Sequence, residues 1–102
     1  MNVRREIEAF ADIMEYKMAV HDDRGVLWKK MDLPFFVKRI GDEYAEMNLK
    51  LTKGATVMEK QNEFADIANF CMMGSWKVQD DWANETVARM ERADERKRLE
   101  EK

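Results

Sequence analysis

Residues that break helices or crosslink chains are scarce in this sequence. Its 102 residues include one Cys, one Pro and four Gly. A β-sandwich or β-barrel has a turn signal about every 8–12 residues, so this scarcity of turn formers excludes both folds. The lone cysteine, Cys71, has no partner for an internal disulfide. The composition therefore favours an all-α fold without covalent crosslinks.

Long apolar runs are missing as well. No stretch approaches the roughly 18 consecutive apolar residues of a membrane span, and the first residues, MNVRREIEAF, lack the apolar core of a signal peptide. The 18 basic and 21 acidic residues give a net charge of −3, so no overall positive field attracts a phosphate backbone. We therefore expect a cytoplasmic protein that binds neither membranes nor nucleic acids.

The chain length allows one compact domain, with an expected radius of gyration of about 13 Å. A chain of this size hides only roughly 60 to 70% of the surface that its unfolded form exposes. Because self-association adds burial, a homodimer or homotetramer is expected. Within the chain, residues 1–90 are expected to form the domain, and residues 91–102, ERADERKRLEEK, a charged tail.

Apolar periodicity predicts four helices. The first carries a stripe of apolar residues at spacings i, i+3, i+4, i+7 and i+11, namely Ile7, Phe10, Ala11, Met14 and Met18. Turn residues follow at His21–Gly25. The second helix covers residues 34–51, because Asp32 and Pro34 suit the first turn of a helix.

The third helix is predicted over residues 57–76, with Thr56 as N-cap and Gly54 ending the helix before it. From Phe64 onward it is apolar nearly all round, which is typical of a central element. A break near Gln79 and Asp80 then separates it from a fourth helix. The fold expected from the residues is thus a small assembly of four helices.

Two pairs of acidic residues lie where apolar side chains are expected. At about 100° per residue, Glu43 falls on the apolar face of the second helix, with Glu46 at the rim of that face. On the third helix, Glu63 falls on the most apolar arc, and Asp66 lies on the same side. Each pair is spaced i, i+3, so four carboxylates converge if the two faces pack together.

Four unpaired carboxylates in a partly dry place would repel by several kcal/mol, on the order expected for buried like charges. A hard divalent cation neutralises them best, because Mg²⁺ and Mn²⁺ take carboxylate oxygens together with water and phosphate oxygens. One His and one Cys cannot build a zinc shell. The competing interpretation is a set of surface acids with ordinary i,i+4 partners.

The spacing of the four acids resembles that of a known family. The motif ExxE at Glu43 and Glu46 is followed, after 16 residues, by ExxD at Glu63 and Asp66. This pattern is similar to the MazG-like all-α nucleoside triphosphate pyrophosphohydrolase superfamily. The run NEFADIANFCMM, which includes Asn69, resembles the short bacteriophage members in particular. The resemblance covers about residues 14–78.

The resemblance implies a four-helix MazG-like bundle that forms oligomers. It also implies Mg²⁺-dependent cleavage of a (deoxy)nucleoside triphosphate to the monophosphate and pyrophosphate, in the host cytoplasm if the chain is phage-encoded. The metal would be held by Glu43, Glu46, Glu63 and Asp66. Water is the nucleophile, and either Glu43 or Glu46 takes its proton.

Four further residues are candidates for substrate binding. Lys29 and Lys50 flank the acidic helices and could contact the triphosphate. Trp28, placed where family members commonly carry a Trp, either stacks on the base or is a core or interface aromatic. Asn69 either hydrogen-bonds the nucleotide or braces helices. The alternative function is a non-catalytic nucleotide-binding or regulatory module on the same helices.

Overall fold

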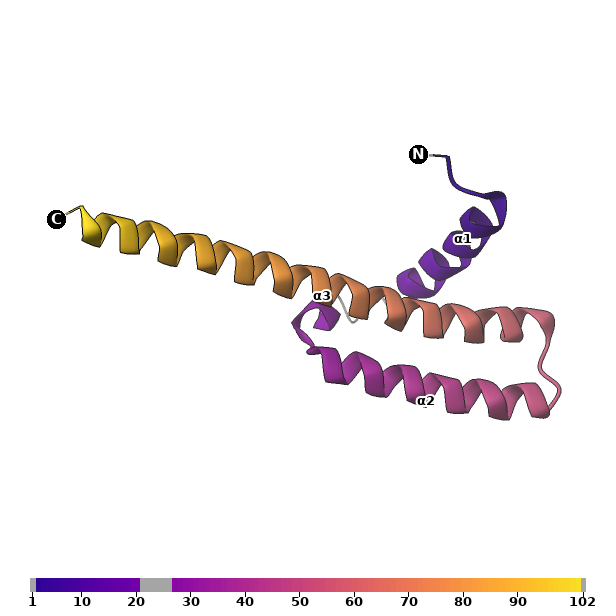
Figure 1. Cartoon of the computed structure of the whole chain (residues 1–102). Coiled ribbons are helices and arrows are strands. Elements are labelled where there is room, and N and C mark those ends of the chain that lie inside the picture. The colour runs from indigo at the N-terminus through magenta and orange to yellow at the C-terminus, as the bar shows by residue number, and fades with distance from the viewer. Residues whose placement is uncertain (1, 21–26, 102) are drawn as a thin grey trace.

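The computed structural model describes residues 2–20 and 27–101, and these are almost entirely helical (Figure 1). In chain order the elements are α1 (Arg5–Val20), the short 3-10 helix η2 (Leu27–Lys30), α2 (Leu33–Thr52) and α3 (Val57–Glu100). The described segments contain no strand. The all-α prediction is confirmed, while the turn predicted at His21–Gly25 lies outside the described residues.

Local capping chemistry fixes where α2 and α3 begin. The Asp32 side chain accepts a hydrogen bond of 3.0 Å from the Phe35 backbone N–H, so Asp32 is the N-cap of α2. Thr56 and Glu59 form a capping box at the start of α3, in which each side chain accepts from the backbone N–H of the other. Gly54, at φ +81°, lets the chain turn between the two helices.

The predicted break near Gln79 and Asp80 is wrong. A single helix of 44 residues, α3, replaces the expected third and fourth helices. The physical reason lies in residues 75–100, which contain neither Gly nor Pro, so nothing in this stretch breaks a helix. Ion pairs at i,i+4 support the exposed helix, as between Lys77 and Asp81 at 3.2 Å.

The long α3 also makes the chain more extended than expected. The radius of gyration is 19.6 Å and the principal extents are 72 × 33 × 23 Å, against about 13 Å expected for a compact domain. Figure 1 shows the second half of α3 projecting away from the other helices. Residues 91–101 are all exposed, and residues 91–100 continue this helix.

α2 folds back along the first half of α3 to form an antiparallel hairpin (Figure 1). Phe36, which is fully buried, lies beside Gly74, where an added Cβ would come 3.7 Å from the Phe36 Cβ. Ala65 and Met73 complete the buried apolar core of the described residues. This core is small, so the hairpin leaves much apolar surface in contact with solvent.

α1 crosses α3 at an angle and packs only lightly on it (Figure 1). None of its residues is buried. The Asn69 side chain amide on α3 donates a 3.2 Å hydrogen bond to the Met14 backbone carbonyl, and Lys17 pairs with Asp66. Polar contacts from α3 therefore hold the C-terminal half of α1.

Candidate metal centre

Two carboxylates are buried between α2 and α3. Glu63 is 2% exposed and Glu43 is 8% exposed, each among the most buried polar residues that the structure describes. The helices expose their other faces, so burial follows the positions that the sequence periodicity assigns to the apolar arcs. A buried carboxylate is costly unless it is paired with a cation or hydrogen-bonded. Both residues therefore need a positive partner.

Glu43, Glu63 and Asp66 come together. Each offers a carboxylate oxygen within 4.8 Å of those of the other two. Glu46 lies outside this trio and is exposed, although it shares a partner with Glu63. The structure thus brings three of the four predicted metal-binding residues into one cluster, which we call the carboxylate trio, and leaves Glu46 at its edge.

Basic side chains face the carboxylates. Lys50 lies 2.5 Å from Glu63 Oε1 and 3.2 Å from Glu46 Oε1, so it bridges the two helices. Hydrogen bonds to these two acids raise the pKa of Lys50 above its usual value, and the ammonium stays charged. The predicted substrate-binding residue Lys50 is thus placed at the carboxylates.

Two further cations complete this arrangement. Arg39 pairs with Glu43 at 3.1 Å and with Asp42 at 3.1 Å along α2. Lys17 reaches from α1 to Asp66 at 3.3 Å. The Arg39–Glu43 and Lys50–Glu46 pairs have the i,i+4 spacing that is usual for surface acids. The Lys50–Glu63 and Lys17–Asp66 pairs instead join different helices.

The basic side chains do not satisfy every carboxylate oxygen. The second oxygens of Glu43 and Glu63, both named Oε2, are buried without a hydrogen-bond partner. Burial raises the pKa of Glu43 above its usual value, and the negative charges of Glu46 and Asp66 add to this. These unpaired oxygens leave coordination capacity for a further cation.

The donor set fits a hard divalent cation. Carboxylate oxygens are the ligands that Mg²⁺ and Mn²⁺ prefer, and opposite ligands of Mg²⁺ stand about 4 Å apart. The oxygens of the carboxylate trio, within 4.8 Å of one another, lie near that range. Glu43, Glu63 and Asp66 could therefore hold such an ion, with the unpaired Oε2 atoms among its ligands.

Two other predicted substrate-binding residues, Trp28 and Lys29, pack on α3 at Trp76. Trp28 on η2 packs edge-to-face on Trp76 of α3, with ring centroids 5.2 Å apart. The Lys29 ammonium lies 5.6 Å from the Trp28 ring centroid and 5.3 Å from that of Trp76. Trp76 follows Asp66 by ten residues, which is about 15 Å along an α-helix.

Asn69 lies close to the carboxylate trio, one turn beyond Asp66. It is 6% exposed and braces α1 through its amide N–H, as one of its two predicted roles requires. Its Oδ1 atom is buried without a partner. Asn69 therefore combines a structural contact with an unused acceptor.

Sequence reasoning did not single out Lys17 as a residue of the site. Its only signal is its position at i+4 from Ile13 and i+7 from Phe10, which puts a basic residue at the edge of an apolar stripe. The sequence likewise gives no signal that Trp76 is the partner of Trp28. Both become visible once α1 and η2 are placed against α3.

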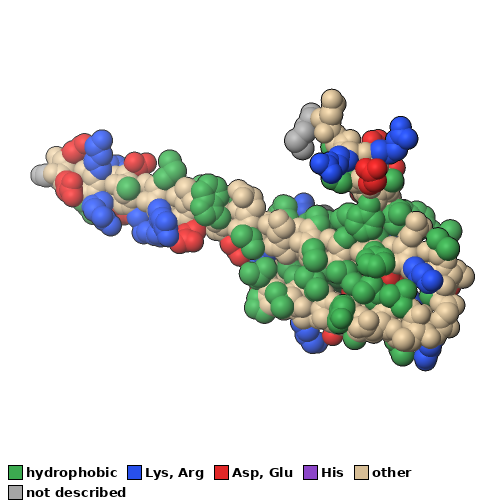
Figure 2. All heavy atoms as spheres, turned by 45° about the vertical axis from the view of Figure 1, so that its right-hand side comes forward, with side chains coloured by type: hydrophobic (Ala, Val, Ile, Leu, Met, Phe, Trp, Pro, Cys, Tyr) green, Lys and Arg blue, Asp and Glu red, His purple; other side chains and the backbone are tan. Residues whose placement is uncertain are grey.

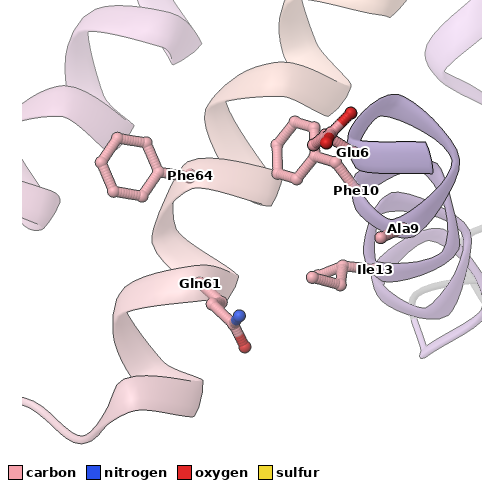
Figure 3. A pocket seen from close by; sticks show the side chains of 6 residues that line it. All are labelled: Glu6, Ala9, Phe10, Ile13, Gln61 and Phe64. Carbon is pink, nitrogen blue, oxygen red and sulfur yellow. The ribbon is translucent and has the colours of Figure 1, made fainter. Parts of the chain in front are cut away.

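A separate hollow lies between α1 and the first turns of α3 (Figure 3). It has a volume of about 380 Å³ and is lined mainly by apolar side chains, including Phe10, Ile13 and Phe64. It shares no lining residue with the carboxylate trio. The hollow reflects the light packing of α1.

Comparisons with protein-family models, curated proteins and solved structures return no significant match to this chain. Within the described residues, no helix has both the length and the apolar character needed to cross a membrane.

Proposed function

We propose that this chain is a Mg²⁺-dependent nucleoside triphosphate pyrophosphohydrolase that acts in the cytoplasm. One observation carries the proposal: the Glu63 carboxylate is 2% exposed, lies in reach of Glu43 and Asp66, and keeps one oxygen without a partner. A protein that needed only structural ion pairs would gain little from a buried, half-satisfied carboxylate. A divalent cation would satisfy it.

The motif resemblance supplies the reaction class. ExxE and ExxD, spaced as in the MazG-like superfamily, fall on two antiparallel helices, as shared metal binding requires. Carboxylate ligands leave room for phosphate oxygens on the same ion, so a nucleotide polyphosphate is the substrate class that suits the site. The products would be a (deoxy)nucleoside monophosphate and pyrophosphate.

The proposed reaction is a hydrolysis at the α-phosphorus and needs no oxidant or reductant. The oxygen of water forms a bond to the α-phosphorus, and the bond to the oxygen that bridges to the β-phosphorus breaks. That oxygen leaves with pyrophosphate, while Glu43 or Glu46 takes the proton of the water. Of the two candidates, Glu43 belongs to the carboxylate trio, whereas Glu46 lies at its edge. When bound, the divalent cation neutralises phosphate charge and orients the substrate.

The substrate contacts are proposed on chemical grounds. Lys50 offers an ammonium group to phosphate oxygens at the trio, and Asn69 offers an unused carbonyl oxygen to a donor of the nucleotide. Lys29 lies over the Trp28 and Trp76 rings and offers its ammonium group to the substrate at η2. Trp28, paired with Trp76, offers an aromatic surface for a base. These assignments divide the substrate between a phosphate end at the trio and a base end at η2.

A non-catalytic nucleotide-binding or regulatory module is the second candidate. The ion pairs of Lys17, Arg39 and Lys50 with the four acids favour it, because they offset carboxylate charge without a metal. Such a module would bind nucleotides without turnover. The presence of all four acids favours the hydrolase.

We also propose that two copies pair through α2, alone or within a tetramer. Six apolar residues of α2, which we call the α2 stripe, recur at alternating spacings of four and three: Leu33, Val37, Ile40, Tyr44, Met47 and Leu51. Four of them are 39 to 63% exposed. Figure 2 shows hydrophobic side chains gathered over the α2–α3 hairpin, whereas the end of α3 is mostly charged.

The spacing of the α2 stripe is symmetric about its midpoint, which makes a second copy the occupant that suits it. In an antiparallel pair of α2 helices, Leu33 of one copy lies opposite Leu51 of the other, and Val37 lies opposite Met47. Every apolar residue thus meets an apolar residue, as a two-fold interface requires. Because the core of the single chain is small, much apolar surface stays exposed, and its burial drives the pairing.

Release of pyrophosphate tests the catalytic proposal. Purified protein is incubated with Mg²⁺ and a panel of dNTPs, NTPs and guanosine tetraphosphate, and pyrophosphate is measured for wild type, Glu63→Gln and the exposed control Glu95→Gln. We expect release from at least one triphosphate, a loss of about 100-fold or more in Glu63→Gln, and no change in Glu95→Gln. Nucleotide binding without release from any substrate would favour the regulatory module.

A further inference from the structure

Two of the cations at the carboxylate trio come from elements other than that of the acid they face. Lys50 on α2 holds Glu63 of α3, and Lys17 on α1 holds Asp66 of α3. Each uses a carboxylate oxygen, Glu63 Oε1 and Asp66 Oδ1, on a side chain that the proposed metal also needs. A divalent cation on these side chains, even at their other oxygens, would share the negative charge that holds the ammonium groups and so compete with them.

The charges around the trio set the direction of this competition. Three cations, Lys17, Arg39 and Lys50, face five acids, so the cluster carries a net charge of −2; the acids are Asp42, Glu43, Glu46, Glu63 and Asp66. One bound divalent cation neutralises that charge, and two raise it to +2. Metal binding thus removes the negative charge that repels a polyphosphate anion.

We propose that Lys17 and Lys50 are exchangeable countercations, which pair with Asp66 and Glu63 before metal binds and with the phosphates of the substrate afterwards. This inference rests on the proposed function, because it takes the carboxylate trio as the metal site. It adds Lys17 to the residues that hold the substrate. It also gives the metal a second role, since the metal frees the cations that bind phosphate.

The two lysines are able to make this exchange. The Lys50 side chain is 41% exposed and already contacts two acids, so its ammonium can turn toward solvent without leaving the helix edge. Lys17 is 18% exposed, but it sits on α1, which has no buried residue and borders the hollow of Figure 3. α1 can therefore shift with little loss of packing.

The exchange predicts effects of opposite sign in one variant. Removing either ammonium should strengthen metal binding without anions, because a competitor is gone. It should weaken polyphosphate binding with metal, because a phosphate contact is gone. A lysine that only stabilises the fold would not produce this crossed pattern.

The test uses Lys17→Met, Lys50→Met and the control Lys77→Met in the full chain. Lys77 is 19% exposed and pairs with Asp81, so it matches Lys17 in burial but lies outside the cluster. Mn²⁺ affinity is measured by electron paramagnetic resonance without anions. Inorganic tripolyphosphate affinity is measured by calorimetry with Mn²⁺ saturating, and circular dichroism reports folding.

We expect Mn²⁺ affinity to rise about two- to fivefold in Lys17→Met and Lys50→Met, and tripolyphosphate affinity to fall about tenfold or more. Lys77→Met should change neither. If wild type binds Mn²⁺ and both lysine variants match it in both measurements, the exchange is overturned and the metal site stands. If wild type binds no Mn²⁺, the proposed function is overturned together with the exchange.

A measurement on wild type covers the case in which a variant does not fold. Reductive methylation followed by mass spectrometry reports the accessibility of each ammonium group. Mn²⁺ should speed methylation of Lys17 and Lys50 about twofold or more, and added tripolyphosphate should slow it again, while Lys77 stays constant. Equal rates at Lys17 and Lys50 in all three conditions would overturn the exchange.

Discussion

The ammonium of Lys50 lies 2.5 Å from Oε1 of Glu63, a carboxylate that is only 2% exposed and belongs to the neighbouring helix. This contact ties α2 to α3 at the level of the carboxylate trio. It joins a partly exposed cation to a buried anion, so the two partners are unequal: the cation can leave for solvent, whereas the anion cannot. Loss of the cation should therefore show directly in the stability of the chain.

Lys50→Met should lower the free energy of unfolding by about 2 kcal/mol without metal, because it leaves the buried Glu63 charge without its closest cation. Divalent metal should restore part of this loss, since a ligand that binds only the folded state stabilises it. Urea unfolding with and without Mn²⁺ measures both effects. The exposed control Lys38→Met should change little, and a loss of the same size there would contradict the assignment.

The capping box at Thr56 and Glu59 gives a prediction about pH. Hydrogen bonds with Thr56 lower the pKa of Glu59, so the charged carboxylate is favoured in the folded state. Its contribution to stability is present above the ordinary glutamate pKa and is lost as the pH falls through the lowered folded value. In Glu59→Gln, the free energy of unfolding should therefore fall less on acidification than it does in wild type.

Thr56→Ala is the companion variant, and it should cost about 1 kcal/mol at neutral pH because α3 loses its N-cap. Unfolding by urea at pH 3, 5 and 7 measures both variants. An unchanged pH profile in Glu59→Gln would show that the Glu59 charge does not contribute through the capping box.

Self-association through the α2 stripe predicts that Tyr44→Lys dissociates the protein into single chains, because a charge would lie at the centre of the interface. Leu49→Lys is the matched control: Leu49 is 55% exposed, Tyr44 is 57% exposed, and Leu49 lies off the stripe. Sedimentation velocity at micromolar concentration measures the mass. A wild type that is strictly monomeric would contradict the proposal, and so would a Tyr44→Lys variant that stays associated.

Removal of residues 91–102 should leave stability within about 0.5 kcal/mol of wild type, because residues 91–101 are all exposed and lie far along α3 from the core. Mn²⁺ affinity should also be unchanged. Urea unfolding and electron paramagnetic resonance of the shortened chain check these expectations. A large loss of stability would place these residues in the domain, against the boundary at residue 90.

The fold could be predicted where short-range chemistry decides it. The starts of α2 and α3 follow from Asp32 and Thr56, whose side chains cap the backbone within three residues. The continuity of α3 could not be predicted from Gln79 and Asp80, because polar residues are tolerated in an exposed helix as well as in a turn. Their state depends on the i,i+4 contacts and the uninterrupted helix formers around them.

The burial of Glu43 and Glu63 was predictable, because the face of a helix follows from its period. The cationic partners of the buried and neighbouring acids could not all be predicted from the sequence. Arg39 is four residues from Glu43 and could be found by spacing. Lys17 meets Asp66 only through the placement of α1 on α3, which is a tertiary contact that no local pattern encodes.

Mn²⁺ binding by wild type and by Glu63→Gln, measured in solution by electron paramagnetic resonance, tests the metal site most directly. The variant keeps the shape of the side chain and an acceptor for Lys50, so its fold should be retained while one charged ligand is lost. We predict binding by wild type and a loss of affinity of about 10- to 100-fold in Glu63→Gln. Equal affinity in the two proteins, or no binding by wild type, would contradict the assignment of Glu63 as a metal ligand.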